Sequence, residues 1–295
     1  MHFTLSSLVI LAAAVWTVTA QPEHISLNPP RSVAKPIDWA SLAPATGPVT
    51  NAKRFAQGLP PLKPRGRKHH RGSTYNNIEN AALKRATRAA SAPRSDTSPI
   101  PPVQQKCNIL VKTADATLGY LAPSLNIFGE YGQFQGAQAG SLEVSISYVP
   151  GSEASVDIVP TNGPTKAYPF MGGAIGYSSP NSNFNPGTRG YAYVAATPQS
   201  PSGSPPVSGD NSFAVATGMS SDYESAIWIY DPSTFEIDAQ WVNTDGSKPT
   251  TYVLFANDGN DALVLTGDPN TLNNDFGTSY PGVTLTCVPP VSLPA

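Results

Sequence analysis

The sequence predicts an all-β fold: a two-sheet antiparallel sandwich, jelly-roll-like, over residues 106–290, preceded by a disordered basic segment. Short apolar runs of strand-forming residues alternate there with Gly, Pro, Asn and Asp turns. No run of about ten residues repeats its apolar side chains with the 3.6-residue period of a helix. The only two cysteines, Cys107 and Cys287, enclose nearly all of this region. Together these features favour a single β-domain closed by a disulfide bond.

The densest strand pattern lies between residues 225 and 268. Four apolar runs are separated by turn-forming sequences: Ala226–Tyr230, Glu236–Val242, Tyr252–Phe255 and Ala262–Leu265. This spacing predicts an antiparallel meander. Trp228 lies in a run that is apolar on both faces, and Trp241 shares a strand face with Ile237 and Ala239. Both tryptophans are therefore expected in the core.

Further strands are expected before the meander. Residues 142–148 alternate apolar and polar side chains, which predicts a half-buried strand with Glu143 on the solvent face. Shorter strands are expected at residues 156–158, 191–194 and 210–215. The glycine-rich run Gly172–Gly176 lacks the spacing of a phosphate-binding loop and is interpreted as a β-bend. A long loop is expected at residues 197–209.

The two cysteines lie in predicted strands near the two ends of the folded region. An even count in a secreted chain favours one disulfide bond, Cys107–Cys287, with two buried free thiols as the alternative. Closing a loop of this length stabilises a domain by roughly 5 kcal/mol in the loop-entropy model, and usually by less in practice. The bond requires the first and last strands to be neighbours.

The N-terminus has the pattern of a secretory signal peptide. The apolar run Leu5–Val18 is followed by small residues up to Ala20, which predicts a signal peptide over residues 1–20 with cleavage after Ala20. The alternative is an N-terminal anchor that is not cleaved. The run is too short to span a bilayer comfortably. We expect a secreted, extracellular protein without a membrane span.

Residues 21–105 are basic and proline-rich, with 13 basic residues against four acidic ones, a net charge of about +9. Residues 106–295 carry five basic and 16 acidic residues, about −11. We expect residues 21–105 to be disordered, as a linker or a propeptide, and residues 291–295 to form a tail. The pairs Lys53-Arg54 and Lys84-Arg85 are candidate processing sites. Nucleic acid is not an expected partner, because no folded nucleic-acid-binding module accompanies the basic segment.

One run in this segment resembles a known group of sequences. Residues 50–62 read TNAKRFAQGLPPL, and residues 240–246 and 265–268 read QWVNTDG and LTGD. These pieces resemble uncharacterised secreted proteins of mushroom-forming (basidiomycete) fungi. In that group a TNAKRxAxGLPPL-type block lies between a signal peptide and a β-rich domain. The resemblance implies a fungal lineage and secretion. It implies no catalytic residue, because no activity is assigned to the group.

The positions of the four histidines limit the chemistry. All of them precede residue 106, so the predicted domain has no imidazole for nucleophilic catalysis or for the usual zinc and copper sites. Neither a metal nor another cofactor is expected. Carboxylates remain as candidate catalytic groups. Glu130 and Glu143, with Gln240 as an amide partner, would suit a glycosidase or a protease resembling the glutamic peptidases.

Aromatic side chains are the other candidate site groups. Tyr131, Tyr177 and Tyr223 stand beside turn residues and are expected to be exposed, where they would contact sugars. The expected function is therefore a non-catalytic extracellular protein in contact with cell-wall polysaccharide. The first alternative is a carboxylate-dependent acid hydrolase with a removable basic propeptide. The second is a basic arm that docks onto its own acidic domain. The sequence does not specify an oligomeric state.

Overall fold

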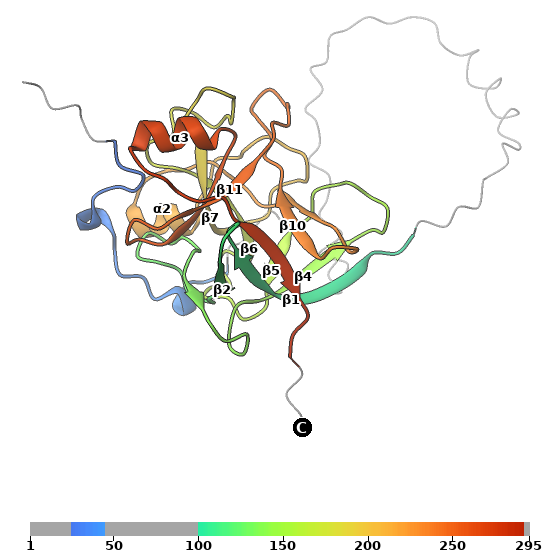
Figure 1. Cartoon of the computed structure of the whole chain (residues 1–295). Helices are drawn as coiled ribbons and strands as arrows, with labels where there is room; N and C mark the ends of the chain where they lie inside the picture. Colours follow the sequence, from blue (N-terminus) through green and yellow to red (C-terminus); the bar gives the residue numbers. More distant parts are fainter. Residues whose placement is uncertain (1–24, 45–99, 292–295) are drawn as a thin grey trace, which may run out of the picture.

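The computed structural model describes residues 25–44 and 100–291 (Figure 1). Within them the fold is all-β, as predicted, and consistent with an antiparallel sandwich. The strands are β1 (Val103–Lys112), β2 (Thr117–Leu121), β3 (Phe134–Gln135), β4 (Glu143–Tyr148), β5 (Ile158–Pro160), β6 (Phe170–Ile175), β7 (Tyr191–Thr197), β8 (Tyr223–Glu224), β9 (Trp228–Tyr230), β10 (Glu236–Ala239), β11 (Tyr252–Ala256), β12 (Ala262–Thr266) and β13 (Thr284–Val288). The helices are η1 (Arg31–Val33), η2 (Trp39–Ser41), α2 (Ser212–Thr217) and α3 (Pro269–Phe276).

Hydrogen bonds join the strands into one 13-stranded sheet that curves as a half-barrel. Its order is β11-β12-β7-β6-β5-β4-β1-β13-β10-β9, with β2, β3 and β8 attached beside this path. The two ends of the path turn back toward its interior. Trp228 of β9 bridges to Val156 just before β5, and Leu254 of β11 bridges to Gly282 just before β13. The curvature encloses the main core.

The predicted disulfide bond is confirmed. Cys107 lies in β1 and Cys287 in β13, and their Cα atoms are 5.3 Å apart. The two strands pair antiparallel, with Ile109 opposite Cys287. The first and last strands of the sheet are therefore neighbours, as the bond requires. The sheet begins at Val103, three residues before the predicted domain boundary.

The predicted meander is correct in its strands but wrong in their pairing. The strands β9, β10, β11 and β12 all form, but as two hairpins at opposite ends of the sheet path. Strand β10 already has β9 and β13 as its two neighbours. The chain leaves the sheet after β10, where the Trp241 amide N–H donates to the Thr251 hydroxyl at 3.0 Å.

Two local predictions are also wrong. Residues 210–215 were expected as a strand, but α2 forms there. The Asn211 side chain caps the Ala214 amide, and Gly218 ends the helix at φ 75°. The run Gly172–Gly176 was expected as a bend, but most of it belongs to β6. Glycine suits β6 because a Cβ at position 172 would meet the Glu224 backbone.

Strand β7 separates two apolar clusters, because its side chains alternate between the two faces of the sheet. The inner cluster holds Ala192, Val194 and Ala196 together with Trp228 and Trp241, so both tryptophans are in the core as predicted. The outer cluster is built on the opposite face from Tyr191, Tyr193 and Ala195, with Phe213 of α2, Leu272 and Phe276 of α3, and Leu27.

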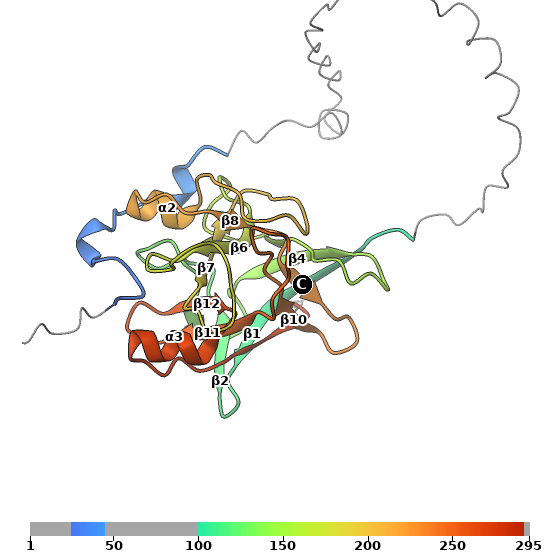
Figure 2. The same ribbon diagram turned by 90° about the horizontal axis from the view of Figure 1, so that it is seen from above.

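Residues 25–44, here called the N-terminal strap, differ from the expectation of a disordered segment. The strap lies along the outer cluster, beside α2 and α3 (Figure 2). Leu27 is 2% exposed and Asn28 3% exposed. The Lys35 amide donates to the Ala216 carbonyl at 2.8 Å, which ties the strap to α2. Docking of the basic segment onto the acidic domain was one of the alternatives that the charge distribution suggested, but the strap docks through apolar and hydrogen-bonded contacts, and no ion pair joins it to the domain among the described residues.

Several predictions fall on residues that the structure does not describe. They are the signal peptide with Ala20, the pairs Lys53-Arg54 and Lys84-Arg85, and the tail after residue 291. Among the described residues, no helix has the length and apolar character needed to cross a membrane.

Candidate functional site

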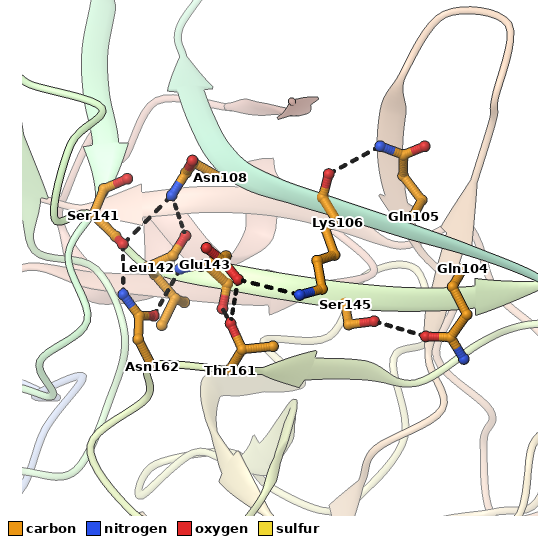
Figure 3. A network of polar contacts seen from close by, with 10 residues as sticks. All are labelled: Gln104, Gln105, Lys106, Asn108, Ser141, Leu142, Glu143, Ser145, Thr161 and Asn162. Carbon is orange, nitrogen blue, oxygen red and sulfur yellow. Dashed lines mark hydrogen bonds and ion pairs between the residues drawn. The ribbon is translucent and has the colours of Figure 1, made fainter. Parts of the chain in front are cut away.

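The predicted catalytic residues lie apart. Glu143 is on the solvent side of β4, within a network of surface polar contacts (Figure 3). Its Oε1 accepts the Thr161 hydroxyl at 2.9 Å and lies 4.0 Å from the Lys106 ammonium. The Glu143 side chain is 35% exposed, so the ion pair is screened by water and contributes little to stability. These contacts tie β4 to β1 and to the residues after β5.

Gln240 has its amide group engaged elsewhere. Its Nε2 donates to the Pro249 carbonyl at 2.7 Å and to the Trp241 carbonyl at 3.4 Å. Both contacts hold the turn between β10 and β11. The Glu–Gln pair required by a glutamic-peptidase-like mechanism is therefore not assembled from the predicted residues.

Glu130 lies where β7 and β12 separate. The Tyr131 amide donates to the Val194 carbonyl at 2.8 Å, and the Leu263 amide donates to the Tyr131 carbonyl at 2.7 Å. The short segment at Glu130 is thus inserted between two strands. Glycines make the insertion possible: a Cβ at Gly129 would collide with the Ser212 backbone, and one at Gly132 with the Asp261 backbone.

The Glu130 carboxyl group is fully buried on the outer face. Its Oε2 accepts the side-chain amide of Asn126 at 2.7 Å and that of Asn28, from the strap, at 3.4 Å. Its Oε1 has no hydrogen-bond partner among the described residues, and neither has the buried Oδ1 of Asn28. Unpartnered buried polar atoms are rare in folded proteins, so these two oxygens call for an explanation.

Burial makes Glu130 a neutral acid over a wide pH range. Desolvation raises its pKa to about 8, and the Asp258 carboxylate adds to the rise, while the amides of Asn126 and Asn28 oppose it. A neutral carboxyl group has an O–H that can donate a hydrogen bond. Glu130 is therefore a carboxylic acid in acidic and neutral solution, as a general acid or a hydrogen-bond donor requires.

Two tyrosines of β7 connect the strap and the neighbouring loop. The hydroxyls of Tyr191 and Tyr193 both donate to the Leu27 carbonyl at 2.6 Å. The same hydroxyls accept the amides of Ser178 at 2.9 Å and Tyr177 at 3.1 Å. The strap is thus joined through two phenols to the loop that carries Tyr177.

A surface hollow of about 390 Å³ opens beside that loop. Its lining combines one exposed aromatic ring, Tyr177, with apolar side chains such as Met219 and with hydroxyls and a carboxylate, those of Ser179, Ser182, Ser220, Ser221 and Asp222. Asp222 accepts the Ser208 hydroxyl at 2.6 Å and the Ser182 hydroxyl at 3.1 Å. The carboxylate is thereby fixed in position at the hollow.

Of the three tyrosines expected at the surface, only Tyr177 is exposed, at 45%. Tyr131 is 1% exposed because its segment is inserted between β7 and β12. Tyr223 is 7% exposed because β8 pairs with β6 and its backbone also bridges to Val207. The expectation of exposure at Tyr131 and Tyr223 was wrong.

The candidate site residues that the sequence did not single out are Asn28, Asn126, Tyr191, Tyr193 and Asp222. Their roles depend on contacts between residues far apart in the chain, such as Asn28 with Glu130, 102 positions away. The one feature of the local sequence that pointed to this site was the pair of glycines on either side of Glu130-Tyr131. In the part of the chain that the structure describes, no group of three or more potential metal ligands gathers.

No family model, curated protein or solved structure matches the chain.

Proposed function

We propose that this chain is a secreted, non-catalytic protein that binds cell-wall polysaccharide in the hollow beside Tyr177. The observation that carries the proposal is the exposed Tyr177 ring next to a fixed carboxylate and several hydroxyls. The flat face of an aromatic ring packs against the C–H groups of a sugar. Carboxylate oxygens accept hydrogen bonds from sugar hydroxyls, and serine hydroxyls both donate and accept them.

The size and openness to solvent of the hollow agree with this role. A volume of about 390 Å³ lies within the range of pockets that hold small ligands, so it suits one or two sugar rings of a longer chain. The disulfide bond between the first and last strands supports an extracellular location, because such bonds persist in oxidising compartments. The signal-peptide pattern and the resemblance to secreted fungal proteins support the same location.

Binding of the full chain to wall polysaccharides, such as insoluble β-glucan and chitin, tests the proposal. We expect Tyr177→Ala to weaken binding by about tenfold or more, since aromatic contacts dominate small interfaces. Tyr252→Ala is the matched control: Tyr252 is 46% exposed but does not line the hollow. Absence of binding by the unmodified chain, or equal losses in the two variants, would refute the proposal.

A second candidate function rests on Glu130. A buried carboxyl group that keeps its proton at neutral pH can serve as the general acid of a glycoside hydrolase. The strap covers Glu130, so this acid hydrolase would act only after the strap has left. Hydrolysis of polysaccharide or denatured protein at acidic pH that disappears in Glu130→Gln would favour it over the binding function.

A further inference from the structure

We infer that the surface of Tyr191, Tyr193 and Glu130 that the strap buries is a recognition site for an extended peptide containing Leu followed by Asn, and that residues 25–28 of the strap are its resident ligand. This surface lies beside the Tyr177 hollow, and the inference does not depend on polysaccharide binding.

The main chain of the strap is recognised by two donors that converge on one acceptor. Both tyrosine hydroxyls donate to the Leu27 carbonyl at 2.6 Å. The Ser178 hydroxyl donates to the Ser26 carbonyl at 2.7 Å. Two consecutive carbonyls of the strap therefore accept hydrogen bonds from side chains of the domain. Such main-chain contacts provide affinity without requiring particular side chains in the peptide.

The two side chains of the Leu-Asn pair supply selectivity. Leu27 is 2% exposed, within the outer cluster beside Tyr191, Tyr193 and Phe213. Burying a leucine side chain stabilises a complex because it removes apolar surface from water. Asn28 places its amide against the Glu130 carboxyl group at 3.4 Å. An apolar side chain at this position would leave the Glu130 carboxyl group without this donor.

The polar atoms without partners lie on both sides of this contact. Glu130 Oε1 belongs to the domain, and Asn28 Oδ1 belongs to the strap. The domain therefore has a hydrogen-bonding oxygen that its own strap does not satisfy. Buried polar atoms without a partner are rare, so this oxygen is a candidate for a further hydrogen bond with a bound peptide.

Charge has a small part in the contact. The positively charged side chain of Arg31 in the strap donates two hydrogen bonds to the domain. Both acceptors are neutral: the Gly259 carbonyl and the Asn260 side chain, each at 2.9 Å. No ion pair joins the strap to the domain among the described residues. The contact is therefore apolar and hydrogen-bonded, and we expect its affinity to change little with salt concentration.

The test uses the full chain with residues 66–72 replaced by the seven-residue recognition sequence of a specific viral protease. After cleavage, native mass spectrometry or gel filtration determines whether the N-terminal fragment remains bound to the domain. We expect it to remain bound and to be displaced by an excess of a synthetic peptide of residues 21–42. Separation of the fragments immediately after cleavage would overturn the inference.

Variant peptides establish which contacts matter. We expect the Leu27→Asp peptide to compete at least about 30-fold less well, from the cost of losing a buried leucine. The Asn28→Ala peptide is expected to lose about fivefold to tenfold. Ser32→Ala is the matched control, because Ser32 is exposed, and it should compete like the unmodified peptide. Equal competition by all four peptides, or displacement by 0.5 M salt alone, would also overturn the inference.

Discussion

The two faces of β7 are closed in different ways. On the inner face, Ala192, Val194 and Ala196 pack against side chains of the curved sheet, whose first and last strands share a disulfide bond. On the outer face, Tyr191 and Tyr193 are covered by α2, α3 and the strap. The inner closure comes mainly from the sheet, with Leu42 of the strap packed against the same cluster. The outer closure includes Leu27 of the strap. On the inference above, this part of the strap separates while the sheet stays folded.

Two buried glutamates show the same contrast. Glu224 is 1% exposed, and both of its carboxyl oxygens lie 3.3 Å from the amide of Val242, a buried residue of the segment that follows β10. Glu130 instead leaves one oxygen without a partner among the described residues and contacts Asn28 of the strap. Burial raises the pKa of Glu224 to about 9 and that of Glu130 to about 8. Burial therefore raises the pKa of both glutamates, although the strap contributes to the surroundings of Glu130 alone.

The largest expected effect is on the inner face. Trp241 is fully buried, stacks on Phe184 with ring centroids 4.6 Å apart, and donates from its indole to the Ser182 carbonyl at 2.9 Å. We expect Trp241→Ala to lower the free energy of unfolding by about 3–5 kcal/mol. Denaturant titration followed by circular dichroism measures it. A loss below about 1 kcal/mol would show that the inner face is not the main source of stability.

The pH dependence compares the two glutamates. In the folded state each carboxyl group keeps its proton far above the ordinary pKa of 4.5, whereas in the unfolded state it ionises near 4.5. The unfolded state therefore binds fewer protons in this window. The contribution of these two groups to stability should be greatest below pH 4.5 and fall as pH rises, to about pH 8 for Glu130 and about pH 9 for Glu224. The slope is at most about 1.4 kcal/mol per pH unit for each group.

Unfolding measurements at pH 5, 6, 7 and 8 check this expectation. Glu130→Gln and Glu224→Gln should each flatten the slope, because an amide does not ionise. Removal of the strap should reduce the Glu130 contribution, since water then reaches one side of that carboxyl group, and leave the Glu224 contribution. Stability that rises from pH 5 to pH 8 in the unmodified chain would contradict both assignments.

The smallest effect on global stability is expected on the outer face. Leu27→Ala should release the strap while changing the free energy of unfolding of the domain by about 1 kcal/mol or less, because local opening precedes global unfolding. Hydrogen exchange should then accelerate at the Tyr177 and Ser178 amides, which the two tyrosine hydroxyls accept. Ser32→Ala serves as the control. A loss as large as that of Trp241→Ala would show that the strap is integral to the core.

The sequence predicted features that depend on neighbouring residues or on chain ends. Apolar runs between turns indicated the strands β9 to β12. The number and position of the cysteines indicated the Cys107–Cys287 bond. Helix α3 also had local signals that the strand-based interpretation passed over: Asp268 caps it, Pro269 begins it, and Gly277 ends it at φ 64°. A short helix with such caps remains detectable without apolar periodicity.

The site was much less predictable, because its members meet only after the sheet has curved. Glu130 was selected as one of several carboxylates, but its burial depends on Asn28 and on the separation of β7 from β12. Tyr131 was expected at the surface because glycines are near it. The same glycines allow its segment to enter the sheet. Proximity of a residue to glycine therefore indicates either a turn or a close backbone approach, and sequence alone does not separate the two.

The disulfide bond also determines how the domain responds to mechanical force. Force applied between residues 100 and 291 enters through β1 and leaves through β13, where Cys107 and Cys287 are covalently joined. The load then passes through the sulfur atoms and bypasses the 180-residue loop between them. In a single-molecule pulling experiment the oxidised domain should show no unfolding step. After reduction it should lengthen by about 600 Å, the extended length of that loop.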